Sequence, residues 1–133
     1  MLQAPNGIAE VEPADSRKTA RVMANIDRAR IRDLQISMGG DFDQLFEYFA
    51  QDMLSYHEQL ARAFEANRLD EGRRIAHTVK STSLLFGGGE MAKQAKELED
   101  AFVSGDRLPE KLTQLRESMT HHLEQLKLEL SAR

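Results

Sequence analysis

The chain has 133 residues, of which 41% are hydrophobic and 30% are charged, and its formal net charge at pH 7 is −4. This length fits one domain with a modest core, and the negative charge argues against nucleic acid as the main partner, because nucleic-acid-binding domains usually carry a basic patch. The lack of cysteine excludes disulfides, thiol nucleophiles and thiolate metal sites. No run approaches the roughly 18 apolar residues of a membrane span and the N-terminus lacks the apolar region of a signal peptide, so we expect a cytoplasmic protein.

The N-terminal part is predicted to be a tail followed by a helix. Residues 1–15 contain proline and glycine and show little hydrophobic periodicity, which is typical of a flexible tail. Residues 16–133 are expected to form the domain. Its first predicted helix covers 16–38, with these candidates for burial: Ile26, Ala29, Ile31, Leu34 and Met38. Gly39-Gly40 is expected to end this helix, because glycine tolerates the left-handed conformation found just past a helix.

A second, longer helix is predicted to begin at Asp41, which together with Gln44 resembles a capping box. Its apolar residues recur at steps of three and four over about six turns. They are Phe42, Leu45, Phe46, Phe49, Met53, Tyr56, Leu60 and Phe64. We interpret these side chains as core packing. A turn follows at 67–70, where Asp70 is a candidate cap for the next helix.

The third predicted helix has two chemically different faces. An apolar stripe with steps of four, three and four consists of Ile75, Val79, Thr82 and Phe86. The other face, rotated by about half a turn at about 100° per residue, carries His77, Lys80, Ser81 and Leu84. A histidine that served only in the core would lie in the apolar stripe. His77 does not, so it is predicted to be exposed.

Two further helices complete the predicted domain. Gly87 to Gly89 is expected to close the third helix, and the next apolar stripe consists of Met91, Ala95, Leu98 and Phe102. A turn at 105–109 follows, with Pro109 suited to a first helical turn. The final stripe consists of Leu112, Leu115, Met119, Leu123, Leu126 and Leu130. Short links between amphipathic helices predict an all-α, antiparallel up-and-down four-helix bundle with an additional N-terminal helix.

The exposed face of the third helix is the candidate site. Residues three and four apart on a helix are neighbours, so His77, Lys80 and Ser81 share one patch of surface. Imidazole is nucleophilic when neutral and titrates near neutral pH. A histidine beside a fixed cation, without bulky neighbours, is suited to carrying an anion on its ring, and we expect that anion to be a phosphoryl group.

The segment from His77 to Gly87, HTVKSTSLLFG, resembles the signature of histidine-containing phosphotransfer (HPt) domains, which typically reads H-T-L-K-G-S-S-x-x-L-G. The positions with the same or a similar residue are His77, Thr78, Val79, Lys80, Ser83, Phe86 and Gly87. The stretches LDEGRRIAHTVK and LEDAFVSGD also look like the family's helix ends, so the resemblance covers about residues 27 to 130. One departure is Ser81, where the family usually has glycine.

The resemblance implies a phosphorelay intermediate. His77 would accept a phosphoryl group from the aspartyl phosphate of a receiver domain and pass it to another receiver aspartate, and Lys80 would neutralise charge on the phosphoryl oxygens. The implied partner is a response-regulator receiver domain, which a hybrid histidine kinase can also carry. That partner would supply the aspartate, the Mg²⁺ and most of the catalysis. The chain has no GxxxxGK[ST] loop, and we expect a carrier that binds no cofactor of its own rather than a self-sufficient kinase.

Five residues near the histidine are candidates for docking the partner. Ser81 and Leu84 would form an apolar surface beside the ring, and Arg73 and Arg74, one turn earlier, would meet acidic residues around the receiver's aspartate. Gly87 is assigned first to helix termination and second to docking. A solvated cationic face and an exposed leucine without function are open alternatives.

The other histidines are assigned no catalytic role. His57 is predicted to be a surface histidine. His121 and His122 are adjacent, so they point in different directions on a helix and make a poor metal pair. The sequence lacks an HExxH arrangement, and no metal site is expected.

Three alternatives compete with the phosphorelay interpretation. A degenerate HPt-like adaptor would bind signalling partners without being phosphorylated; intact His77 and Lys80 weigh against it and Ser81 slightly for it. The dimerising hairpin of a histidine kinase usually has an acidic residue after its histidine, where this chain has Thr78. A purely structural bundle would not require the offset of His77 from the apolar stripe. The resemblance favours a monomer, although an exposed apolar patch could equally be buried in a homodimer.

Overall fold

The computed structural model of the protein describes residues 26–131. Its elements in chain order are α2 (Arg28–Met38), the 3₁₀ turn η2 (Gly39–Asp41), α3 (Phe42–Glu65), α4 (Leu69–Leu85), α5 (Gly89–Ser104) and α6 (Leu108–Ser131). The predicted tail over 1–15 and the first part of the predicted N-terminal helix lie outside the described residues.

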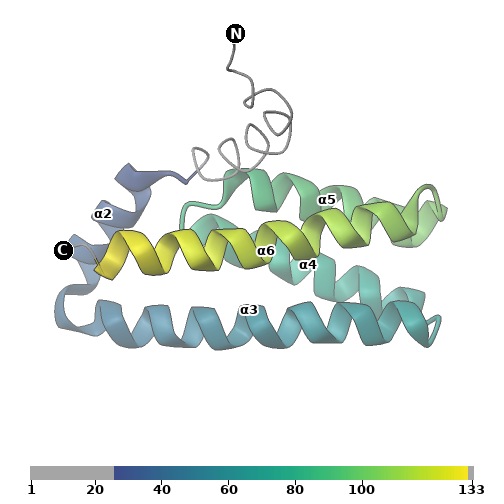
Figure 1. Cartoon of the computed structure of the whole chain (residues 1–133), viewed down its shortest axis with the longest axis horizontal. Coiled ribbons are helices and arrows are strands. Elements are labelled where there is room, and N and C mark those ends of the chain that lie inside the picture. Colours follow the sequence, from purple (N-terminus) through teal and green to yellow (C-terminus); the bar gives the residue numbers. More distant parts are fainter. Residues whose placement is uncertain (1–25, 132–133) are drawn as a thin grey trace, which may run out of the picture.

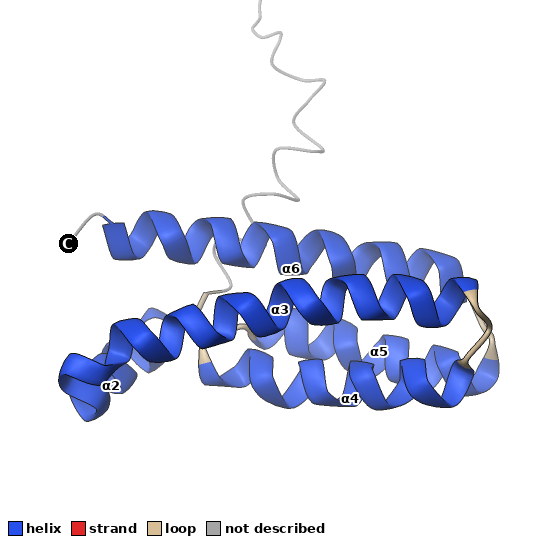
Figure 2. Cartoon of the chain, turned by 90° about the horizontal axis from the view of Figure 1, so that it is seen from below, coloured by secondary structure: helices blue, strands red, loops and turns tan. Residues whose placement is uncertain are grey.

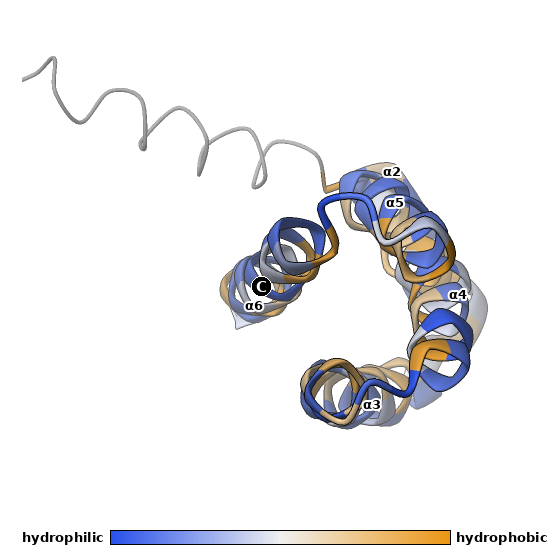
Figure 3. Cartoon of the chain, turned by 90° about the vertical axis from the view of Figure 1, so that its right-hand side faces the viewer, coloured by the Kyte–Doolittle hydropathy of each residue, from blue (hydrophilic) through white to orange (hydrophobic). Residues whose placement is uncertain are grey.

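The four long helices α3 to α6 pack against one another as an antiparallel bundle (Figure 1), which confirms the predicted all-α class and four-helix packing. Short turns connect successive helices at the two ends of the bundle (Figure 2). Viewed from one end, α4 and α5 form one flank, while α3 and α6 form the opposite one (Figure 3). None of the helices in the described part of the chain combines the length and apolarity of a membrane span.

The first described helix begins later than the sequence pattern predicted. Ile26 forms an isolated antiparallel bridge with Gly88, and Asp27 has extended dihedrals and caps α2 by accepting a hydrogen bond from the Arg30 N–H at 3.0 Å. The prediction of one continuous helix over 16–38 is therefore wrong at 26–27. Aspartate is a favoured N-cap because its carboxylate satisfies a free helical N–H. The helix ends at Gly39 as predicted, with a positive φ of 54°.

Two predicted helix caps are also wrong. Asp41 stands at the N-cap position of α3 but makes no side-chain cap hydrogen bond, because it belongs to the preceding 3₁₀ turn and already has helical dihedrals. Helix α4 begins at Leu69, so Asp70 lies inside its first turn rather than at its cap. There the negative charge still interacts favourably with the positive end of the helix dipole.

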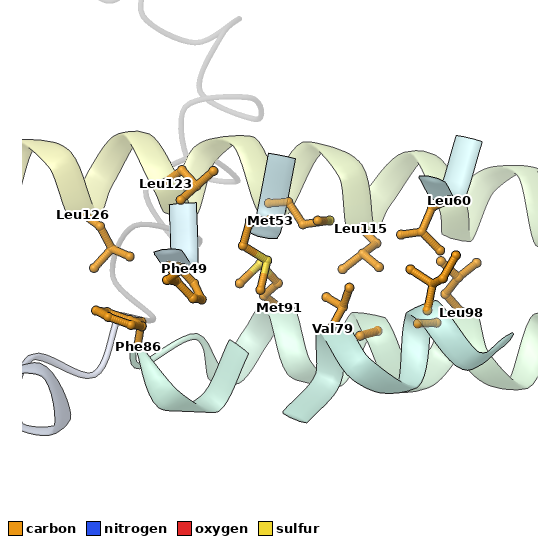
Figure 4. Close-up of a cluster of buried hydrophobic side chains, with 14 of the residues drawn as sticks. Phe49, Met53, Leu60, Val79, Phe86, Met91, Leu98, Leu115, Leu123 and Leu126 are labelled. Atoms are coloured by element: carbon orange, nitrogen blue, oxygen red, sulfur yellow. The ribbon is translucent and has the colours of Figure 1, made fainter. Parts of the chain in front are cut away.

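The core lies between the four helices and consists largely of the predicted apolar stripes. Met53 and Leu60 of α3 point towards side chains of the other three helices, as Figure 4 shows. The ring of Phe86, at the end of α4, is fully buried and packs against Phe49 at a centroid distance of 4.3 Å. The interpretation of the aromatic residues of α3 as core packing is confirmed for Phe42 and Phe49, which are buried.

Candidate functional site

Helix α4 turns one face to the core and presents His77 on the other. The buried residues of α4 include Ile75, Ala76, Val79 and Ser83. The side chain of His77 is 56% exposed, and Ser81 and Leu84 on the same face are exposed as well. The predicted offset between His77 and the apolar stripe is therefore confirmed.

The buried face of α4 differs from the prediction in one residue. Thr82 is only half-buried, whereas Ser83 is fully buried. Burial of Ser83 is possible because its hydroxyl donates to the carbonyl of Val79 at 2.6 Å, which satisfies the polar group within the helix.

A glycine five residues before the histidine, Gly72, allows α5 to lie close to α4. Gly72 is buried, and a Cβ atom at this position would collide with the ring of Phe102 on α5. Only a residue without a side chain allows this ring to lie on α4. The contact fixes α5 against α4 about one and a half turns from His77.

The close approach of α5 places Glu99 beside the candidate site. Its Oε2 lies 3.1 Å from His77 Nδ1 and its Oε1 lies 3.6 Å from Lys80 Nζ, while its side chain is only 14% exposed. Oε1 is shielded from solvent and has no hydrogen-bond partner among residues 26–131, since the 3.6 Å to Lys80 Nζ is longer than a hydrogen bond. The positive charge of the nearby Lys80 ammonium group offsets the negative charge on this oxygen.

The contact with Glu99 determines which nitrogen of His77 can react. A carboxylate can only accept a hydrogen bond, so Nδ1 carries the proton and donates it to Glu99. In the neutral ring, Nε2 then holds the free lone pair. Since the side chain is more than half exposed, Nε2 is the nitrogen available for attack on a group that approaches from solvent.

The predicted docking residues lie in different environments. Leu84 is 53% exposed, two turns from His77, and Arg74 is exposed while Arg73 is half-buried. Neither arginine has an ion-pair partner within residues 26–131. The exposed Ser81 hydroxyl donates to the His77 carbonyl at 3.5 Å, the limit of a hydrogen bond.

Gly87 is the one predicted docking residue that the structure places in the interior. It is buried, its φ is 71°, and its carbonyl accepts the Asp27 N–H at 2.9 Å. A Cβ atom at Gly87 would lie 2.8 Å from the Asp27 carbonyl oxygen. The residue thus joins the start of α2 to the end of α4, and the exposed surface around the histidine does not include it.

Two other histidines, His122 and His57, are at least partly enclosed by the bundle. His122 is buried, and its Nε2–H donates to the carbonyl of Phe86 at 3.0 Å. Burial lowers the pKa of His122, with the hydrogen bond to Phe86 opposing it. His57 was predicted to be a surface histidine but is half-buried, with Nδ1 3.2 Å from Arg116 Nη2. In the part of the chain that the structure describes, no three histidine or acidic side chains are grouped so that they could hold a metal ion.

Comparison with known families agrees with the sequence signature. The family model described as Hpt domain matches residues 44–133, a range that contains His77, Lys80 and Glu99. No curated protein and no solved structure matches the chain.

Proposed function

The chain belongs to the Hpt domain family, and we propose that it is a phosphorelay intermediate whose acceptor atom is His77 Nε2. The phosphoryl group would arrive from the aspartyl phosphate of a receiver domain and leave to the aspartate of another. The observation that carries this proposal is the pairing of His77 Nδ1 with Glu99 at 3.1 Å, on an exposed ring beside Lys80.

The transfer step follows from this pairing. The Nε2 lone pair of His77 attacks phosphorus, an N–P bond forms, and the bond between phosphorus and the aspartyl oxygen breaks, which returns the aspartate as a carboxylate. No proton has to leave Nε2, since Glu99 already holds the tautomer with hydrogen on Nδ1. The ring gains positive charge as the bond forms, and the carboxylate of Glu99 stabilises it electrostatically. The reverse sequence passes the phosphoryl group on.

Lys80 contributes a positive charge next to the acceptor. It lies one turn after His77, and its side chain is 30% exposed. A flexible ammonium group can move from Glu99 towards the phosphoryl oxygens without requiring a single geometry. Phosphoryl transfer depends mainly on in-line positioning and on neutralising oxygen charge, so Lys80 would stabilise both the transition state and the phosphorylated form.

The remaining catalytic groups are assigned to the partner. Hpt domains act in phosphorelays with receiver domains, and we propose that the receiver brings the aspartate and the Mg²⁺. Leu84 and Ser81 would form the surface on which the receiver lies, and Arg73 and Arg74 would face the acidic residues around its aspartate.

A transfer assay tests the proposal. The full chain is mixed with a phosphorylated receiver, in parallel with the His77→Gln variant and with a receiver whose acceptor aspartate is replaced by asparagine. An acid-labile, alkali-stable label on the wild-type chain alone is the expected result. The variant should unfold at nearly the wild-type temperature, because the side chain that it replaces is exposed. Receivers that bind the chain without labelling it would overturn the proposal in favour of a docking-only adaptor.

A further inference from the structure

Helices α3 and α6 lie on the flank of the bundle opposite α4 and α5 (Figure 3). Between them is a second cluster of polar side chains. Here α3 and α6 border an open cleft of about 340 Å³. Its lining residues are His57, Thr113, Arg116, Glu117, Thr120 and His121. None of these residues takes part in the proposed transfer at His77.

Arg116 is the charged centre of this cleft, and its side chain is incompletely satisfied. Its Nε is shielded from solvent and has no hydrogen-bond partner within residues 26–131. Its Nη2 donates to His57 Nδ1 at 3.2 Å, and no carboxylate of the described residues forms an ion pair with it. A shielded donor without a partner is costly and rare in proteins. The guanidinium group, which lines the cleft, therefore keeps hydrogen-bonding capacity that the described residues do not use.

The surroundings of Arg116 supply further donors. Because arginine can only donate, His57 accepts at Nδ1 and carries its own proton on Nε2. Burial first, and then the charge of Arg116, lower the pKa of His57, while a hydrogen bond with the backbone of Arg116 opposes them; the net lowering favours this neutral form. The exposed hydroxyl of Thr113 adds another donor to the lining. Glu117 is the one carboxylate there, and it would oppose a negative ligand.

We propose that this cleft binds a small oxyanion, a phosphate or a carboxylate, with Arg116 as its charged anchor and His57 and Thr113 as further hydrogen-bond donors. The planar guanidinium group matches the paired oxygens of both ligand classes. A cation is disfavoured because Arg116 would repel it. The volume lies near the lower end of the usual range for small-molecule sites, about 300–1,000 Å³.

A titration by nuclear magnetic resonance (NMR) tests the proposal on the full chain. Inorganic phosphate is added at constant ionic strength while the imidazole resonances of His57 and His121 are followed. Acetate and citrate form a second arm, which separates phosphate from carboxylate recognition, and sodium chloride gives the effect of salt alone. Saturable shifts with at least one oxyanion are expected. Shifts no larger than those produced by chloride would overturn the proposal, since Arg116 would then only cover the seam between α3 and α6.

Substitutions distinguish a specific site from general charge. Arg116→Gln is expected to weaken oxyanion binding about tenfold or more, the usual effect of losing a charged hydrogen bond. Arg30→Gln removes an exposed arginine of α2 and should leave binding unchanged. Glu117→Gln should tighten binding by about two- to fivefold because it removes a like charge; weaker binding in this variant would indicate a cation and contradict the proposal.

Should Arg116→Gln fail to fold, the test rests on Glu117→Gln, expected to tighten oxyanion binding, and on Thr113→Val, expected to weaken it. His77→Gln should bind the oxyanion as wild type does, which keeps this outcome separate from that of the transfer assay.

Discussion

His77 and His122 each donate one ring N–H to an oxygen, yet their surroundings give them opposite roles. On the face formed by α4 and α5, Nδ1 of His77 is held by the carboxylate of Glu99 and the rest of the ring is open to solvent. In the interior, Nε2 of His122 is held by the carbonyl of Phe86, and the ring lies edge-on to Phe49 at 6.4 Å. An exposed imidazole ring whose N–H donates to a carboxylate is suited to act as a nucleophile. A buried imidazole ring whose N–H donates to a neutral carbonyl is suited to a structural contact.

The interior region should show the larger effect on stability. His122→Ala is expected to lower the free energy of unfolding by about 2–4 kcal/mol, because it leaves a cavity and removes the hydrogen bond to the buried carbonyl of Phe86. His77→Ala should change it by no more than about 0.5 kcal/mol, as is usual for exposed positions. Urea denaturation followed by circular dichroism measures both. Equal losses of unfolding free energy in the two variants would contradict the assignment of His122 to the core and of His77 to the surface.

The exposed region should show the larger effect on transfer. Glu99→Ala is expected to slow phosphoryl transfer to His77 by about 10- to 100-fold, the range expected for losing a charged hydrogen bond that orients the ring. Glu97→Ala on the same helix is the matched control. Glu99→Gln keeps an acceptor oxygen for Nδ1 and should recover part of the rate. A rate equal to that of wild type in Glu99→Ala would exclude Glu99 as a positioning residue.

Partner docking should be affected less strongly and without loss of folding. Leu84→Asp is expected to weaken receiver binding by about three- to tenfold, since it places a charge in an interface of apolar contacts. Ile36→Asp is the matched control, because Ile36 is an apolar residue with 75% exposure on α2. Affinity is measured by calorimetric titration with the receiver that phosphorylates the chain. If both variants bind equally well, Leu84 is not part of the docking surface.

The smallest expected effect is the pH dependence of stability that His122 contributes. Burial lowers its folded-state pKa, so the unfolded chain binds more protons between the folded and unfolded values. This contribution to stability is complete above the unfolded imidazole pKa of about 6.5 and is lost as the pH falls below it. His57, with its pKa also lowered, acts in the same direction. Thermal unfolding between about pH 7.5 and pH 5.5 should therefore depend less on pH in His122→Asn; an unchanged slope would assign the effect elsewhere.

The helices and the exposed face of α4 could be predicted because both follow from local periodicity. At 100° per residue, the positions of His77 and Lys80 relative to Ile75 and Val79 are fixed once the segment is helical. The start of α2 could not be placed in this way, because it depends on the pairing of Ile26 with Gly88, which is distant in sequence.

Glu99 was missed because its role depends on how α5 lies against α4. That register is set by Phe102 packing on Gly72, a contact that no spacing within one helix reveals. A signal was nevertheless present, since Glu99 lies four residues after Ala95 and three before Phe102, on the edge of the apolar stripe of α5. A carboxylate there becomes largely shielded from water.

His122 was missed although the criterion applied to His77 would have identified it. It lies three residues after Met119 and four before Leu126, in the apolar stripe of α6. A histidine in such a stripe is expected in the core, and the structure places it there.

The most direct test of the account identifies the phosphorylated atom. The full chain, labelled with ¹⁵N in its histidines, is phosphorylated by a receiver and examined by NMR for coupling between phosphorus and the ring nitrogens. We expect a single phosphohistidine at His77 with phosphorus on Nε2 and hydrogen retained on Nδ1. Phosphorus on Nδ1, or on any other residue, would contradict the role assigned to Glu99 and with it the mechanism.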